Sequence, residues 1–240
     1  MSLTLLAVLF LSLTAAVVVA IVIVLWRQRT STRDGWIAAV AGIVLTGWAL
    51  VAAMLAKGGF FQQPASGSGV PPIGITLAAV LFVLAGCLVV SPSLRRLLTR
   101  QDHLIRLNLW RLVGVIFLIL MAKRQMPALW ALPAGIGDII VGTSAPWIAN
   151  RVGSAPGRRR AVIFNLFGMA DLVVAVGLGV MTSPGPAQVF HTSPTSELAT
   201  HFPLALVPTF LVPLAFTLHV VSLSQLLGGT WARRSSLSHR

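Results

Sequence analysis

The sequence is poor in charged residues, in acidic residues above all, and in cysteine. Of its 240 residues only 10% are charged, 5 are Asp or Glu, and Cys87 is the single cysteine. A soluble domain carries about 25% charged residues, so this composition cannot cover a water-exposed surface. A lone cysteine excludes a disulfide scaffold, and 56% hydrophobic residues exclude disorder. With a mean hydropathy of +0.89, the chain is predicted to be an integral membrane protein.

Seven apolar stretches are each long enough for a membrane-spanning helix, which needs about 20 residues. We therefore predict an all-α, polytopic seven-transmembrane-helix bundle that forms one integral membrane domain over residues 1–240. The two longest connections, residues 57–72 and 182–202, have the composition of surface loops. The expected spans are residues 3–26, 36–56, 73–92, 105–122, 127–148, 161–181 and 203–227.

The basic residues predict the orientation of these spans. They form short clusters between the apolar runs, and most of the 18 Lys and Arg residues fall on one side of the predicted bundle. The other side has only Lys57, Lys123 and Arg124. Because cytoplasmic loops are enriched in basic residues, we expect the N-terminus outside and the C-terminus inside an inner or plasma membrane. Charges dispersed in this way do not form the basic face that nucleic-acid binding needs.

Tryptophan and proline mark expected boundaries and kinks. Tryptophan is enriched where a membrane meets water, so five tryptophans are expected near the ends of spans. Proline removes a helix hydrogen bond, so Pro208 and Pro213 are expected to kink the last span and Pro133 the fifth. The boundary tryptophans are Trp26, Trp36, Trp147 and Trp231 on the basic side and Trp130 on the other.

Polar side chains interrupt the apolar runs only in the second half of the chain. Spans one to three contain no ionisable group except the thiol of Cys87. Since an unpaired charge at the bilayer centre costs about 2.5–3.5 kcal/mol, the polar groups of residues 105–227 are expected to face one another, protein or water. From the helix rise, the two Asp lie roughly 15 Å deep, near the midplane. The polar set is Arg111, Asp138, Asn165, Asp171 and His219.

Two short segments in the fifth and sixth spans are alike. Residues 135–141 read GIGDIIV and residues 168–174 read GMADLVV, so each Asp follows a Gly and a small residue and precedes three aliphatic residues. The two spans run in opposite directions, so the likeness is either an inverted repeat, as in secondary transporters, or a shared packing preference. In both segments small residues share a helix face with the Asp, which lets a neighbouring backbone come close.

The same segments resemble a group of small, uncharacterised multi-pass bacterial membrane proteins. The likeness rests on LPAGIGD at residues 132–138 and GMADL at residues 168–172. It covers roughly residues 105–227 and is weakest over the first three spans. That group has no established activity, so the resemblance implies no catalytic or binding residues.

The polar set favours a small ion- or solute-transporting permease. In this hypothesis Asp138 and Asp171 form a titratable pair, Arg111 is their counter-ion or an anion contact, and Asn165 and His219 complete the binding site. The first alternative is an accessory or sensory membrane protein, binding a partner or lipid, in which the cluster is purely structural. The second is an intramembrane enzyme acting on a lipid-like substrate, for which the sequence offers no nucleophile–base pair.

The two Asp and Arg111 do not balance in charge, so the polar set needs one more positive charge or a proton. Two carboxylates and one guanidinium leave one negative charge, so one Asp is protonated, binds a cation, or pairs with a protonated His219. The spacing matches no metal-binding motif, and a single intramembrane histidine cannot supply two haem ligands. We therefore expect no metal and no cofactor. The expected partners are the lipid bilayer and a small solute or proton.

Overall fold

The structure, a computed structural model, describes residues 2–62 and 71–228, which are mostly helical and contain no β-strand. Seven helices are long and apolar enough to cross a membrane, which agrees with the predicted all-α bundle. Trp231 lies outside the described residues, as do residues 63–70 of the expected loop. The helices are α1 (Leu3–Arg27), α2 (Thr32–Lys57), α3 (Pro72–Val90), α4 (Pro92–Leu97), α5 (Gln101–Arg106), the 3₁₀ helix η1 (Leu109–Gly114), α6 (Val115–Ala122), α7 (Ala128–Ala149), α8 (Ala155–Thr182), the 3₁₀ helix η2 (Ser196–Thr200), the π-helix η3 (Val207–Leu211) and α9 (Val212–Leu227).

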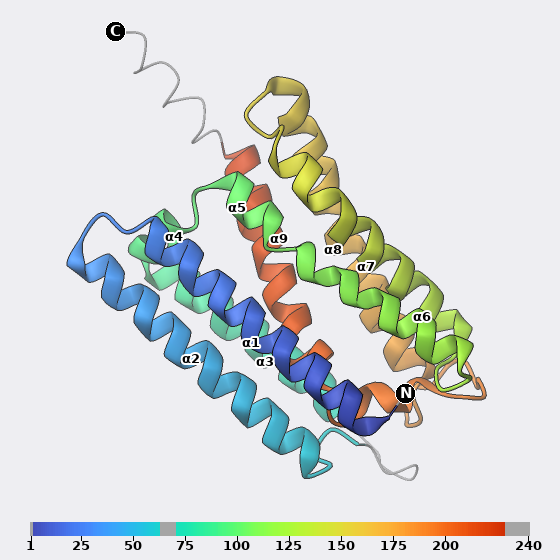
Figure 1. Ribbon diagram of the computed structural model, residues 1–240. Coiled ribbons are helices and arrows are strands. Elements are labelled where there is room, and N and C mark those ends of the chain that lie inside the picture. The colour runs from blue at the N-terminus through green and yellow to red at the C-terminus, as the bar shows by residue number, and fades with distance from the viewer. Residues whose placement is uncertain (1, 63–70, 229–240) are drawn as a thin grey trace, which may run out of the picture.

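Two groups of helices flank a central one. Helices α1, α2 and α3 lie on one side, α6, α7 and α8 lie on the other, and α9 runs between them (Figure 1). Helix α9 contacts α3, α5 and α8, and most of its residues are buried, including His219. Helix α3 has no buried residue, so it lies at the periphery. The polar groups of α9 are therefore enclosed by the rest of the bundle.

The two ends of the bundle differ in charge. The loops after α1, α3 and α7 lie at one end, and the N-terminus of α1 and the loops after α6 and α8 lie at the other (Figure 1). We call the first the arginine-rich end and the second the opposite end, where Lys57, Lys123 and Arg124 lie. The arginines of the arginine-rich end are Arg27, Arg29, Arg33, Arg95, Arg96, Arg100, Arg106, Arg151, Arg158, Arg159 and Arg160.

The fourth span differs from the continuous helix expected over residues 105–122. It begins at Gln101 and is divided into α5, η1 and α6. The division falls at Asn108, whose side-chain Nδ2 donates to the backbone oxygen of Leu104 at 3.1 Å. A side chain that bonds to the local backbone competes with regular helix hydrogen bonds. As a result Arg111 lies in a tightened 3₁₀ turn.

Two helices begin earlier than the apolar pattern predicts. Helix α2 starts at Thr32 and α8 at Ala155, because the side chains of Ser31 and Ser154 accept backbone N–H groups and cap them. Asp34 therefore lies in the first turn of α2, buried and 3.7 Å from the guanidinium of Arg96. Asp34 precedes the expected span of residues 36–56, so the longer α2 contains an acidic side chain that the apolar pattern does not include.

The three prolines predicted to kink a span lie in different settings, and Pro213 is in the first turn of α9. Pro208 lies inside η3, where the helix widens to a π turn before α9 begins. This change is consistent with the backbone N–H that proline lacks. Helix α7, by contrast, continues through Pro133, so the fifth span is not divided there, and a kink at Pro133 stays a prediction. Irregular backbone is therefore found in η1 and η3.

Gly142 allows η1 to approach α7. A Cβ atom at Gly142 would lie 2.7 Å from the backbone nitrogen of Leu112, a contact that requires the backbone to move. We expect Gly142→Ala to lower the free energy of unfolding by about 1–3 kcal/mol, as overpacking does. The matched control is Gly86→Ala in α3, where a Cβ meets nothing within 4 Å. Thermal unfolding in detergent measures both, and an equal response of the two variants would contradict this close contact.

Candidate functional site

Arg111 lies at the centre of a buried charge cluster. Its side chain has no exposed surface, and its Nε donates to Oδ1 of Asp138 on α7 at 2.6 Å. Its Nη2 donates to Oδ2 of Asp171 on α8. The guanidinium therefore binds both carboxylates and joins η1 to α7 and α8. We call these three residues the charge cluster.

The remaining guanidinium nitrogen fixes the state of His219. Nη1 of Arg111 donates to the backbone oxygen of Gly168 at 3.3 Å and lies 3.2 Å from Nε2 of His219. A guanidinium only donates, so Nε2 is the acceptor and the ring proton lies on Nδ1. Nδ1 then donates to Oδ1 of Asn165 at 2.9 Å. His219 is therefore neutral, and all five residues predicted for the site lie together.

A chain of hydrogen bonds continues from Asn165 to the arginine-rich end. Asn165 Nδ2 donates to Ser222 Oγ at 2.8 Å, and Ser222 Oγ donates to Gln101 Oε1 at 2.6 Å. Gln101 Nε2 donates to Gln225 Oε1 at 3.0 Å, and Gln225 Nε2 donates to the backbone oxygen of Leu98 at 2.7 Å. In each step the residue nearer to Arg111 is the donor, and the last acceptor is the backbone oxygen of Leu98. We call this series, from Arg111 to Leu98, the donor chain.

Three members of the donor chain were not predicted from the sequence. Gln101 precedes the predicted span, and Ser222 and Gln225 fall near the end of the last one, where polar residues are common. A signal was present, because His219, Ser222 and Gln225 are spaced three residues apart. Residues at that spacing lie on one face of a helix.

Glycine makes room for the charge cluster between α7 and α8. A Cβ atom at Gly137 would collide with the carboxylate of Asp171, and one at Gly168 would collide with the ring of His219. The small residues beside the two Asp thus allow close approach, as the sequence predicts. The Asp of each of the two similar segments, residues 135–141 and 168–174, forms an ion pair with Arg111. Whether they are a true inverted repeat stays a prediction.

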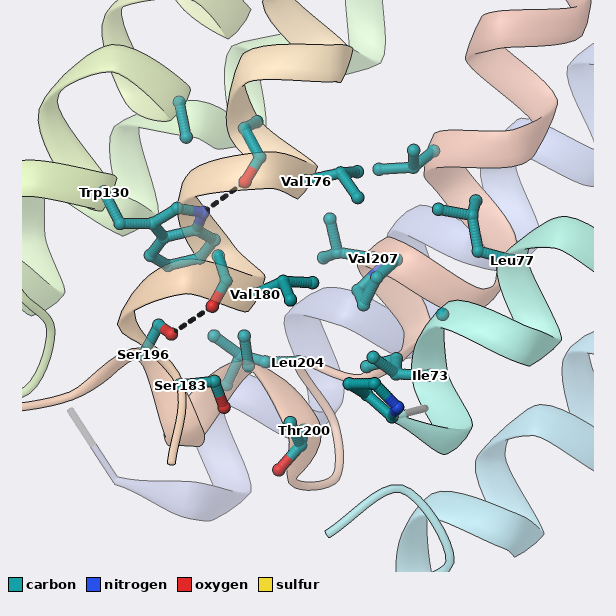
Figure 2. A pocket seen from close by; sticks show the side chains of 18 of the residues that line it. Ile73, Leu77, Trp130, Val176, Val180, Ser183, Ser196, Thr200, Leu204 and Val207 are labelled. Atoms are coloured by element: carbon teal, nitrogen blue, oxygen red, sulfur yellow. Dashed lines mark hydrogen bonds between the residues drawn. The ribbon is translucent and has the colours of Figure 1, made fainter. Parts of the chain in front are cut away.

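An apolar cavity of about 100 Å³ reaches the charge cluster from the opposite end. Ser196 and Thr200 line it near that end, and Asp138 lines it in the middle of α7. Figure 2 shows its aliphatic walls, with side chains from α3, α8 and η3 around the space. Asp138 is the only charged side chain among the described residues that line it. The cavity therefore connects one end of the bundle to one carboxylate of the charge cluster.

Trp130 and part of the 182–202 connection face this cavity. Trp130 lies near the start of α7, as expected for a boundary residue, but it is buried and its Nε1 donates to the backbone oxygen of Ala175 at 2.8 Å. The 182–202 connection is exposed at Val189 and Phe190, as expected for a surface loop, but Ser196 within it is buried and its Oγ donates to the backbone oxygen of Gly179 at 2.6 Å. Both hydrogen bonds appear in Figure 2. These hydrogen bonds attach Trp130 and the 182–202 connection to α8 beside the cavity.

The cluster has no set of ligands for a metal ion. Within residues 2–62 and 71–228, no three His, Cys, Asp or Glu side chains lie close enough to hold one. Both carboxylates instead bind Arg111, and His219 directs its Nε2 at the same guanidinium. The net charge of the charge cluster with two ionised carboxylates is one negative.

Comparison with known proteins gives one match. A family described as a domain of unknown function (DUF8737) matches residues 70–227, well over half of the chain. The matched region contains the charge cluster, the donor chain and most of the cavity lining. No curated protein and no solved structure matches the chain.

Removal of the guanidinium should destabilise the bundle more than removal of either acid. Arg111→Met leaves two buried carboxylates without a cation, and breaking a buried ion pair in this way costs about 3–5 kcal/mol. The control is Arg106→Met, which removes an exposed arginine from α5. Thermal unfolding in lipid nanodiscs measures both.

The triple variant Arg111→Met/Asp138→Asn/Asp171→Asn should recover part of the lost stability. It removes the unpaired charges together with the cation, and removing all partners costs less than removing one. A triple variant less stable than Arg111→Met would contradict the assigned pairing.

Proposed function

Since this chain belongs to the DUF8737 family, a domain of unknown function, its activity has to be inferred from its own residues, and we propose that it is a small permease for an ion or solute. The observation that carries the proposal is the position of Asp138. It binds Arg111 at 2.6 Å and also lines the cavity. A ligand in the cavity would therefore change the charge balance at the centre of the bundle.

In the proposed mechanism Asp138 and Asp171 compete for one guanidinium. A proton or cation that neutralises Asp138 weakens its pairing with Arg111 and leaves the guanidinium to Asp171. The elements expected to respond are η1, which carries Arg111, and η3, which lines the cavity through Val207 and Pro208. Irregular turns of these kinds often occur at functional hinges. The donor chain holds His219 neutral, so that the excess negative charge remains on the carboxylates.

One observation favours the alternative, an accessory or sensory protein with a structural charge cluster. Arg111 is fully buried, and protein acceptors take hydrogen bonds from all three of its nitrogens. Such an arrangement fixes the positions of helices without any ligand. The two functions respond differently when a carboxylate is neutralised without a change in its shape.

Neutral amide variants separate the two functions. We expect Asp138→Asn and Asp171→Asn to reduce proton flux by at least about tenfold, because an amide cannot take up a proton. The measurement is the decay of an imposed pH gradient in proteoliposomes that contain a pH-sensitive dye. Asp102→Asn, which changes an acid of α5 outside the charge cluster, is the matched control and should retain wild-type flux.

Stability measured on the same samples gives the second readout. The permease predicts folded variants without flux, whereas a structural cluster predicts variants with lower thermal stability. Wild-type flux in both Asp138→Asn and Asp171→Asn would contradict the permease.

We further propose that the arginine-rich end faces the cytoplasm, with the N-terminus outside. The support is the basic bias of that end. Single cysteines in a Cys87→Ser background test it in whole cells with a membrane-impermeant maleimide. Gln125→Cys at the opposite end should be labelled in intact cells, and Gly153→Cys at the arginine-rich end only after permeabilisation. Both positions are exposed, so the reverse labelling pattern would refute this orientation.

A further inference from the structure

The walls of the cavity restrict what it can hold. Apart from Asp138, its described lining is uncharged and mainly aliphatic or aromatic. Such a space does not retain water well, because a buried water needs two to four polar partners. A hydrated inorganic ion would lose its shell without gaining ligands in return. The ligand therefore needs an apolar body that replaces water along α3, α8 and η3.

Aromatic rings accompany the carboxylate. Trp110, Phe117 and Trp130 all line the cavity together with Asp138, and the ring centroids of Phe117 and Trp130 are 5.2 Å apart. Trp130 lies eight residues before Asp138 on α7, which places both on one helix face. Aromatic faces attract cations, and a carboxylate binds an ammonium group through charge-assisted hydrogen bonds. This combination of groups is the chemistry that recognises an organic ammonium ion.

The net negative charge of the charge cluster also favours a cationic ligand. Asp138 and Asp171 share one guanidinium, and His219 is neutral because its Nε2 accepts from Arg111. One positive charge in the cavity would neutralise the excess negative charge, whereas an anion would add to it. The arginine itself is fully buried behind its two carboxylates, so it offers no exposed surface to an anion.

We propose that the cavity binds a small organic cation, with its ammonium group at Asp138 and its apolar body between α3, α8 and η3. The inference rests on the proposed permease and names its substrate class. A cavity of about 100 Å³ suits a body of roughly one aromatic ring or a short alkyl chain. Entry is from the opposite end, where the lining includes Ser196 and Thr200.

Three probes of one shape and different charge test the proposal. Benzylamine, benzyl alcohol and benzoate are titrated against the full-length protein in phosphatidylcholine nanodiscs by calorimetry, with empty nanodiscs as the blank. Benzylamine should bind at least about tenfold tighter than benzyl alcohol, and benzoate should bind most weakly. In Asp138→Asn the preference for benzylamine should disappear. Equal affinity for benzylamine and benzyl alcohol in the wild type, or no binding of benzylamine, would overturn the proposal.

A second pair of variants locates the ligand without altering the charge cluster. Val176→Phe fills the cavity from α8 and should abolish benzylamine binding. Val174→Phe changes an exposed position two residues away and should leave binding unchanged. Benzylamine binding that survives Val176→Phe would place the ligand elsewhere and overturn the proposal.

The binding and flux experiments test the substrate class and the permease function independently. Flux that depends on Asp138, without a preference for benzylamine, keeps the permease and removes this substrate class. A benzylamine preference that depends on Asp138, without flux, keeps the binding site and removes transport.

Discussion

One guanidinium that binds two carboxylates organises the interior of this apolar bundle. Three unpaired charges at the centre of a bilayer would cost about 8–10 kcal/mol on insertion scales. Arg111, Asp138 and Asp171 reduce that cost by facing one another. The pairing brings η1, α7 and α8 together, and the small residues Gly137 and Gly142 allow the necessary approach. Charge pairing thus links η1, α7 and α8.

The donor chain extends this constraint to α5 and α9. It begins at a group that only donates and ends at the backbone oxygen of Leu98, so each side chain between them has a defined orientation. Aligned hydrogen bonds of this kind strengthen one another in a low-dielectric interior. The result is an asymmetric bundle. A polar route leads from Arg111 toward the arginine-rich end, and an apolar cavity leads from Asp138 toward the opposite end.

The seven long helices and the grouping of the five polar residues were predictable from the sequence. Long apolar stretches are rare in proteins, and charged residues are rare within such stretches. Long apolar stretches predict long apolar helices, and charged groups within such stretches are costly unless they find partners. Other features depend on tertiary contacts that no local pattern encodes. The break at Asn108 accompanies the close approach of η1 to α7, and the inward position of Trp130 depends on a backbone oxygen of α8. Gln101 was missed because polar residues near the end of a span are ordinary, so only its contact with Ser222 reveals its place.

Whether one guanidinium binds both acids in a lipid bilayer can be measured by solid-state NMR. Protein with ¹⁵N-labelled arginine and ¹³C-labelled aspartate reports through-space transfer from arginine nitrogens to aspartate carboxyl carbons. An Arg100→Gln background removes the transfer of the separate Arg100–Asp102 pair, so that the remaining short-range transfers come from Arg111. The charge cluster predicts two transfers, from Nε to Asp138 and from Nη2 to Asp171, and loss of only the second in Asp171→Asn. A single transfer in the Arg100→Gln background, or none, would contradict it.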